Sequence, residues 1–291
     1  NRIELTDGIL VPVSIDAASL SDPVLIRADK QVLYTFASSV DDMDMGVSDI
    51  VRGADHVTNT ATQIQIIAAM GGRVPAFAHH SLLTGADGEG LSKRLGALSL
   101  RDLRAQGVAK EALLSMMARL GSSQPVEVRM SLDEIAAGFD LSQFGAAPTR
   151  FDQDDLWPLT RHANQQRPFA EVRGLIAGLG VPEGMAEAFW AVASHNITKL
   201  DELADWWALI RDGAEPVVAD EDREFVKQAL AMLPARPWDG ATWSVWTNAV
   251  KGATGRKGKA LFRPLRLALT GRESGPEMAD LMPLLQKTPA V

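Results

Sequence analysis

Hydrophobic residues near the start of the chain follow the pattern of β-strands. Residues 24–27 and 31–37 are rich in Val, Ile, Leu and aromatic side chains. The three residues between these runs are few enough for a hairpin loop, and Val32, Tyr34 and Phe36 alternate onto one face. Residues 48–52 predict a further short strand. The chain is therefore expected to begin with strands.

A helical pattern follows. Ile64, Ile67 and Met70 recur at helical spacing, and Gly71-Gly72 ends the pattern. Residues 58–60 offer three side-chain oxygens for an N-cap. Residues 74–83 return to extended character. The alternation of strands with a helix predicts an α/β part.

Beyond residue 98 the hydrophobic period is mostly that of α-helices. One face of the first of these helices carries Leu113, Leu114, Met117 and Leu120. Ser131 and Glu134 form the sequence pattern of a capping box. The later predicted helices cover residues 183–196, 199–212, 220–233 and 241–251. We therefore expect an α/β N-terminal part followed by mostly α-helical domains.

Composition narrows the class of protein. With 291 residues and 46% apolar side chains, the chain is long enough for about two domains with a sizeable core. It contains no cysteine, which excludes disulfides and thiolate metal sites and favours a cytoplasmic setting. No stretch reaches the ~18 apolar residues of a membrane span. The first residues include no initiator Met and no signal peptide, so we expect a fragment or a processed chain.

Charge is unevenly distributed along the chain. The net charge of −8 excludes a protein that coats nucleic acid by bulk charge. Residues 201–225 hold nine acidic side chains, whereas residues 241–272 hold seven basic ones and no acidic one. The basic stretch is therefore a candidate binding site for anions, and the alternative is a solvated face.

Three polar motifs carry candidate chemistry. Residues 90–96 form a glycine-flanked loop with one hydroxyl and two adjacent cations, which suits a polyphosphate, although no Walker string is present. Arg52 and Asp55 lie between a strand and a helix, where ligands bind in open α/β sheets. Residues 41–44 hold three carboxylates, which suit a metal or acid–base chemistry. The alternatives are a solvated loop, a structural ion pair, and a turn or helix cap, respectively.

The histidines favour no metal site. His79 and His80 are neighbours on a predicted strand. Adjacent strand residues face opposite sides of a sheet, so these two are not expected to share a metal. We expect no metal-ligating residues in the chain.

These motifs, taken in order, resemble those of the glutamyl-tRNA synthetases, a family of class I aminoacyl-tRNA synthetases. The matching strings are SDPVLIR at residues 21–27, YTFASSVDD at 34–42, VRGADHVTNT at 51–60, FAH at 77–79, LSKR at 91–94 and GRKGKALFRPLRLALTG at 255–271. The resemblance covers essentially the whole chain, and it is specific because both ends match in the right order.

The resemblance implies a glutamate–tRNA ligase that uses ATP, with Mg²⁺ accompanying the ATP, to activate L-glutamate and transfer it to tRNA(Glu). The implied ATP-binding residues are Leu91, Ser92, Lys93 and Arg94. Lys93 is the implied catalytic residue, because it would stabilise charge on the departing pyrophosphate. The implied contacts to glutamate or its adenylate are Tyr34, Ser38, Arg52 and Asp55. The implied contacts to tRNA are Lys251, Arg256, Lys257, Lys259 and Arg263.

The resemblance also implies a division into three parts. Residues 1–85 would be the C-terminal half of a Rossmann-type catalytic domain, and residues 86–168 a stem-contact domain with the signature loop. Residues 169–291 would be an all-helical anticodon-binding domain, in which the tryptophans either form the core or stack on bases. We expect a cytoplasmic monomer that contacts no membrane.

The chain departs from the family pattern at three positions. Gly90 stands where the loop usually begins with Lys, Ala54 replaces an acidic residue, and Ser38 replaces a frequent Asn. The five histidines also form no His-x-Gly-His motif, which class I synthetases need to bind ATP. We therefore expect the C-terminal portion of a longer enzyme, which alone makes no glutamyl-adenylate.

Three alternatives remain open at this point. A glutaminyl enzyme would have β-barrels in its anticodon region, which the helical period of residues 183–269 disfavours. A glutamyl-queuosine type enzyme would lack that region altogether. A non-catalytic tRNA-binding or adaptor protein is the alternative from a different class, and Gly90 and Ala54 would then mark a degenerate site.

Overall fold

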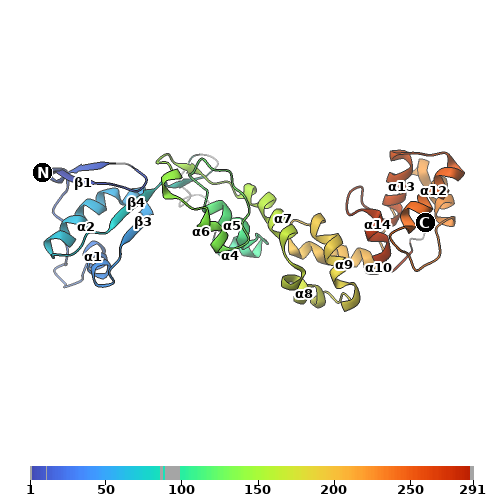
Figure 1. The fold of residues 1–291 in the computed structure, drawn as a ribbon, viewed down its shortest axis with the longest axis horizontal. Helices are drawn as coiled ribbons and strands as arrows, with labels where there is room; N and C mark the ends of the chain where they lie inside the picture. Colours follow the sequence, from blue (N-terminus) through green and yellow to red (C-terminus); the bar gives the residue numbers. More distant parts are fainter. Residues whose placement is uncertain (1, 11, 86–87, 89–98, 289–291) are drawn as a thin grey trace. The chain divides into compact units, whose positions relative to one another are not determined.

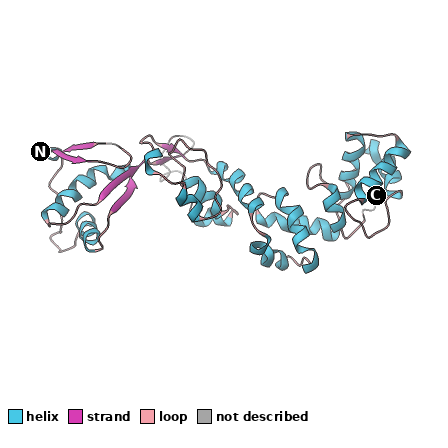
Figure 2. Cartoon of the chain, in the orientation of Figure 1, coloured by secondary structure: helices cyan, strands magenta, loops and turns pink. Residues whose placement is uncertain are grey.

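The computed structural model describes residues 2–10, 12–85, 88 and 99–288, and the chain divides into two compact units (Figure 1). Unit 1 consists of Asn1–Asp102 and Leu113–Leu156, and unit 2 of Leu103–Ala112 and Trp157–Val291. Within the described residues, strands occur only in unit 1, as the colours of Figure 2 show. The predicted α/β part followed by mostly helical domains is therefore confirmed, whereas the three-part division stays a prediction.

The described strands of unit 1 form three two-stranded sheets. β1 (Arg2–Leu5) pairs antiparallel with β2 (Val13–Asp16), and β5 (Leu83–Thr84) pairs parallel with β6 (Thr149–Arg150). β3 (Asp49–Gly53) pairs parallel with β4 (Ala76–His80), and this register places Arg52 opposite His79. Parallel strands need a crossover, which α2 (Val57–Ala69) supplies here. The strand predicted for residues 48–52, the helix predicted after it and the extended segment predicted for residues 74–83 are therefore confirmed.

Short helices complete unit 1 and its boundary with unit 2. They are α1 (Tyr34–Asp44), α2, α4 (Leu100–Ala105), α5 (Lys110–Met117) and α6 (Leu132–Ala137). Ser131 caps α6 by accepting a hydrogen bond from the Glu134 N–H at 3.2 Å. The Glu134 carboxylate accepts from the N–H of Met130 rather than from that of Ser131. The predicted cap is thus present, but the Glu134 side chain bonds the residue before the N-cap and not the N-cap residue itself.

The hairpin predicted for residues 24–37 is shorter than expected. Ile26 and Val32 form an antiparallel bridge, flanked by a hydrogen bond of 2.9 Å from the N–H of Leu33 to the carbonyl of Leu25. From Tyr34 onward the chain is helical, so the predicted strand over residues 34–37 is wrong. Strand propensity is overridden there because α1 packs on α2. The three carboxylates of residues 41–44 lie in the last turn of α1, and not in a separate turn.

The buried face of α5 also differs from the predicted one. Leu114 and Met117 are 41% and 43% exposed. The buried side chains on this helix are Glu111, Ala112, Ser115 and Met116. A buried glutamate is stable there because Arg167, which is distant in the sequence, donates a hydrogen bond to it at 2.9 Å. The apolar stripe alone therefore indicated the wrong face.

Unit 2 is built from helices. They are α7 (Leu156–Gln166), α8 (Phe169–Gly178), α9 (Glu183–Ala193), α10 (Leu203–Asp212), α11 (Arg223–Ala231), α12 (Thr242–Thr254), α13 (Lys259–Thr270) and α14 (Met278–Leu281). Gly255 and Gly271 end α12 and α13 at φ of 72° and 64°, a conformation that favours glycine. The four helices predicted between residues 183 and 251 are confirmed.

Short 3-10 helices occur in both units. They are η1 (Ala17–Ser19), η2 (Ala54–His56), η3 (Leu141–Gln143), η4 (Gln153–Asp155), η5 (Ser194–Asn196), η6 (Leu200–Glu202), η7 (Asp220–Asp222) and η8 (Met282–Leu284). Of these, η2 joins β3 to α2 and thereby positions the residues that follow Arg52.

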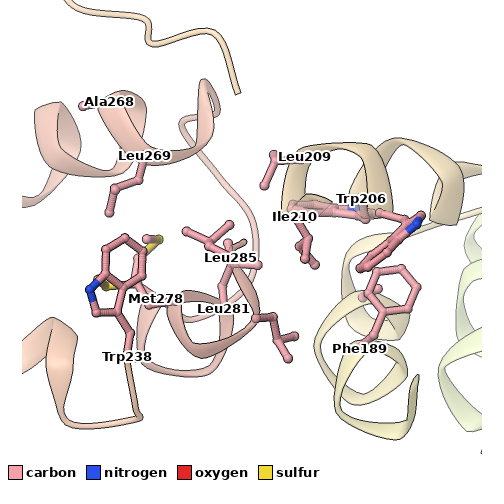
Figure 3. Packing of buried hydrophobic residues seen from close by; sticks show 14 of the residues in the cluster. Phe189, Trp206, Leu209, Ile210, Trp238, Ala268, Leu269, Met278, Leu281 and Leu285 are labelled. Carbon is pink, nitrogen blue, oxygen red and sulfur yellow. The ribbon is translucent and has the colours of Figure 1, made fainter. Parts of the chain in front are cut away.

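One hydrophobic cluster fills unit 2 from α8 to η8. On α10, Trp207 packs edge-on against Phe189 with 5.9 Å between ring centroids, whereas Ile210 lies toward Leu281 and Leu285, as Figure 3 shows. The core interpretation concerns Trp206, Trp243 and Trp246: Trp206 and Trp246 are buried, which confirms it for these two, and Trp243 is partly buried and packs against the cluster. Among the described helices, none by itself has the length and apolar character to cross a membrane, although α8 and the segment Glu183–Asn196, bent by 114°, pass that test as a pair.

Candidate functional site

Arg52 lies near the carboxyl end of β3 and is held by side chains of α2. Its Nη2 donates to Thr60 Oγ1 and to Gln63 Oε1, each at 2.6 Å. Its Cζ also lies 5.6 Å from the centroid of the Phe77 ring. Within the described part of the chain, its buried Nε has no hydrogen-bond partner. The guanidinium is therefore fixed on one side and has donors left for a ligand.

The electrostatic surroundings of Arg52 include two of the predicted site residues. Burial lowers the pKa of Arg52, and electrostatic interactions with Tyr34, Asp42 and Asp55 act in the opposite direction. An arginine stays protonated under such conditions. No ion pair joins Arg52 to Asp55, although the structure describes both residues. The alternative of a structural Arg52–Asp55 pair is therefore wrong.

The predicted contacts to glutamate or its adenylate are brought together by α1, β3 and η2. Gln63 donates from Nε2 to Ser38 Oγ at 3.0 Å, which links α1 to the residues around Arg52. Tyr34 precedes Ser38 by one helical turn, and its side chain is 64% exposed. Asp55 is exposed in η2. We call Tyr34, Ser38, Arg52 and Asp55 the Arg52 site.

A buried polar pair lies behind this site. His79 Nδ1 lies 2.5 Å from Asp7 Oδ2, and His79 Nε2 lies 2.8 Å from Thr60 Oγ1. Asp7 Oδ1 accepts from the N–H groups of Ile9 and Leu10 at 2.9 Å and of His79 at 3.1 Å. Burial raises the pKa of Asp7, but these hydrogen bonds outweigh it and the net result is a lowered pKa. Asp7 is therefore held as a carboxylate.

Sequence reasoning missed Asp7 and Gln63 and misplaced Thr60. The helix α2 begins at Val57, and its N-cap His56 has no side-chain cap bond, so the N-cap predicted within residues 58–60 is wrong. The signal that was available is the spacing of Thr60 and Gln63, which places two polar side chains on one face of a helix with apolar neighbours. Asp7 lies in no motif, and only its contact with β4 reveals its role.

The histidines follow the predicted pattern on β4. His79 is buried and His80 is exposed, so the two face opposite sides of the sheet as expected. Within the described ranges, no group of three His, Asp or Glu side chains is arranged to hold a metal ion.

The signature loop is not described by the structure. Leu91, Ser92, Lys93 and Arg94 lie outside the described residues. Their ATP-binding role and the catalytic role of Lys93 therefore stay predictions.

The predicted tRNA contacts lie on α12, α13 and the connection between them. The side chains of Lys251, Lys257 and Lys259 are exposed. Arg256 pairs with Asp222, and Arg263 pairs with Glu273. The hydrogen bond from Arg263 lowers the pKa of Glu273, and the charge of Lys259 adds to this effect. The three lysines are thus the residues best placed to meet an anion, whereas both arginines have internal partners.

Comparison with known proteins decides the family. The family model for the catalytic domain of class I tRNA synthetases (E and Q) matches residues 1–158, which is more than half of the chain. The chain belongs to this family. A second model, for an anticodon binding domain, matches residues 183–290.

Individual relatives of this class I tRNA synthetase chain are close. Glutamate–tRNA ligase 1 of Paracoccus denitrificans is 70% identical over 98% of this chain and 65% of its own length. Glutamate–tRNA ligase 2 of Jannaschia sp. is 67% identical over 100% of this chain and 65% of its own length. The chain therefore spans about 65% of the length of these relatives.

Two solved structures share the fold. The chain resembles a glutamate tRNA ligase from Elizabethkingia meningosepticum in complex with its amino acid, with a TM-score of 0.81, 22% identity, and coverage of 98% of this chain and 63% of that one. It resembles glutamate-tRNA synthetase from Elizabethkingia anophelis with a TM-score of 0.78 and 22% identity, over the same shares. These two similarities concern the fold alone.

Proposed function

We propose that the protein containing this chain is a glutamate–tRNA ligase. It uses ATP to convert L-glutamate into glutamyl-adenylate, with release of pyrophosphate, and transfers the glutamyl group to the 3′ end of tRNA(Glu). The observation that carries this proposal is the geometry at Arg52, a fixed cation at the carboxyl end of a parallel strand with donors left over. Ligands of open α/β sheets bind at such an end. The names of relatives at 67–70% identity support the choice of glutamate.

In this proposal the Arg52 site binds the amino acid. Arg52 donates hydrogen bonds to a carboxylate of glutamate, because a guanidinium matches the geometry of a carboxylate. Tyr34 and Ser38 offer hydroxyls beside it, and Asp55 accepts from an amino group or a ribose hydroxyl. Each of these groups positions the substrate rather than reacting with it.

Activation is an attack by the α-carboxylate oxygen of glutamate on the α-phosphorus of ATP. The bond from that phosphorus to the bridging oxygen breaks, and pyrophosphate leaves with the electron pair. Leu91, Ser92, Lys93 and Arg94 would bind the ATP phosphates, with Mg²⁺ accompanying them. Lys93 would neutralise the charge on the pyrophosphate, and one such donor is typically worth about 10²–10³-fold in rate.

In this proposal, the helical C-terminal part of the chain binds tRNA through α12, α13 and the connection between them. Exposed Lys251, Lys257 and Lys259 supply cations for phosphates, in a stretch without acidic residues. Residues 1–85, 86–168 and 169–291 would serve as catalytic, stem-contact and anticodon-binding parts, respectively. We assign the protein as a monomer that acts in the cytoplasm, where tRNA is charged.

The chain alone is proposed to be inactive. β3 pairs with β4 on one edge, and no described strand pairs with its other edge. Ile26 and Val51, both in unit 1, are each 52% exposed. An unpaired strand edge and exposed apolar side chains are typical of a surface that another segment covers. That segment would come from the remaining third of the relatives' length and would complete the ATP site.

A charging assay tests the proposal. The full-length gene product is incubated with ATP, Mg²⁺, a tRNA pool and each of the twenty amino acids in turn. We expect attachment of glutamate, and none from the 291-residue chain assayed in parallel. Binding of tRNA without charging by the full-length protein would favour the adaptor alternative, and charging with another amino acid would contradict the proposal.

A further inference from the structure

A continuous line of hydrogen bonds runs from Asp7 to Arg52. The successive distances are 2.5 Å from Asp7 Oδ2 to His79 Nδ1, 2.8 Å from His79 Nε2 to Thr60 Oγ1, and 2.6 Å from Thr60 Oγ1 to Arg52 Nη2. The four residues come from four segments: the turn after β1, β4, α2 and β3. Asp7, His79 and Thr60 are buried. None of these three is therefore placed to touch a substrate.

The donor in the hydrogen bond between Asp7 and His79 follows from which of the two groups carries a proton. Asp7 Oδ1 already accepts three backbone N–H groups, which leaves Oδ2 for His79. A carboxylate only accepts, so His79 carries a proton on Nδ1 and donates it to Oδ2. This bond fixes both the tautomer and the ring orientation of His79.

Thr60 has one proton and two acceptor positions. Arg52 Nη2 only donates, so one acceptor position belongs to Arg52. When His79 is neutral, the Thr60 hydroxyl donates to His79 Nε2. When His79 is protonated, its Nε2 donates to the second acceptor position, and the hydroxyl donates to the carbonyl of His56 at 3.1 Å. Arg52 keeps its bond in both states.

The consequence for Arg52 is a fixed guanidinium plane. Both protons of Nη2 are used, one by Thr60 and one by Gln63. Within the described residues, no hydrogen bond involves Nη1. A guanidinium binds a carboxylate through two parallel hydrogen bonds, which need a defined geometry. Binding is therefore tighter when the guanidinium plane is already fixed before the ligand arrives.

We propose that Asp7, His79 and Thr60 are positioning residues that set the orientation of Arg52 for the amino-acid carboxylate. This inference rests on the proposed function of Arg52. Without the Thr60 oxygen, Nη2 keeps only Gln63, and the plane can rotate about that single bond. Looser binding of the amino acid follows, and the loss falls on the KM for glutamate rather than on the KM for ATP.

Two matched pairs of variants in the full-length enzyme test the proposal. Thr60→Val removes the hydroxyl at nearly constant volume, whereas Thr60→Ser keeps it. His79→Asn places an amide where Nδ1 lies and keeps the bond to Asp7, whereas His79→Gln places an amide where Nε2 lies and keeps the bond to Thr60. Both changes at His79 also remove the ring that stacks on Phe77, at 6.2 Å between centroids, so they share that packing loss.

We expect Thr60→Val and His79→Asn to lower kcat/KM for glutamate about 10- to 100-fold, mainly through KM, with the KM for ATP unchanged. Thr60→Ser and His79→Gln should stay within about threefold of the original enzyme, because the first keeps the oxygen that accepts from Arg52 and the second keeps a hydrogen-bond partner that holds this oxygen in place. Melting temperatures of all four variants are measured alongside.

A glutamate KM that is unchanged in Thr60→Val overturns the inference, as do equal effects of the two His79 variants that follow their loss of stability. Should one variant fail to fold, the pair at the other position still decides. Absence of charging by the original full-length protein would instead overturn the proposed function, so the two failures are distinguishable.

Discussion

The guanidinium of Arg256 lies over the ring of Phe225, with its Cζ 4.0 Å from the ring centroid. The same guanidinium pairs with Asp222 and donates to the carbonyl of Ala260 at 3.3 Å. Arg256 thus ties the beginning of α11 to the connection between α12 and α13. Arg256 lies in the basic stretch that is predicted to contact tRNA, but its observed contacts are structural.

Replacement of Arg256 by alanine should therefore destabilise unit 2. Loss of the stacking and of a half-buried ion pair is expected to cost about 1–3 kcal/mol. Lys257→Ala, the neighbouring substitution, removes an exposed side chain and should stay within about 0.5 kcal/mol of the original chain. Urea unfolding of the chain followed by circular dichroism measures both. Equal stability of the two variants would contradict the structural role.

Lys257 and Lys259 should act on tRNA binding instead. Replacing both with alanine is expected to weaken binding and to reduce the slope of log K against log salt by about 0.7–0.9 for each phosphate that the protein no longer neutralises. Lys287→Ala, at an exposed lysine outside the basic stretch, is the control. Binding is measured by a salt series with the full-length protein. A slope that stays the same, or an equal change in the control, would show that this face does not meet tRNA.

Glu111 and Glu171 provide a comparison around one arginine. Arg167 donates to Glu111 at 2.9 Å and to Glu171 at 2.7 Å, but Glu111 is 5% exposed whereas Glu171 is exposed. Removal of one partner from a buried pair costs about 3–5 kcal/mol, and from an exposed pair on a helix about 0.3–0.5 kcal/mol. Glu111→Ala should thus lower the free energy of unfolding far more than Glu171→Ala. Similar losses in urea unfolding would refute the burial argument.

Asp7 should make the free energy of unfolding depend on pH in the acidic range. Its pKa in the folded protein lies below the ordinary value of 3.8, because hydrogen bonds outweigh the effect of burial. A lowered pKa contributes stability above the unfolded value, and that contribution is lost as the pH falls through the folded value. Asp7→Asn should consequently be less stable than the original chain at neutral pH. In urea unfolding the difference should narrow as the pH falls below 3.8, and a difference that is independent of pH would contradict this assignment.

The sequence predicts those elements whose signals are local. Apolar spacing predicts the helices α9 to α12 and the strand β3, and glycine ends α10 at Gly213 and α12 at Gly255. The strand predicted from Tyr34 onward is wrong because the alternation of aromatic residues is compatible with either a strand or a helix. The packing of α1 on α2 favours the helix. Tertiary contacts thus decided what local propensity left ambiguous.

The residues in and around the Arg52 site likewise fall into those that the local sequence predicts and those that only tertiary contacts reveal. Arg52 and Asp55 were expected because their place between a strand and a helix is visible in the sequence. The contact of Asp7 with His79 joins residues 72 positions apart, and no periodicity reports it. The buried face of α5 was missed for the same reason, since Arg167 is 56 residues from Glu111.

The decisive measurement for a glutamate–tRNA ligase is glutamate charging by the full-length protein, with Lys93 intact and with Lys93→Ala. We expect the intact protein to attach glutamate to tRNA and the substitution to lower kcat about 10²–10³-fold, because pyrophosphate then leaves without its cation. An intact protein that charges no glutamate, or a Lys93→Ala variant with unchanged kcat, would contradict this expectation.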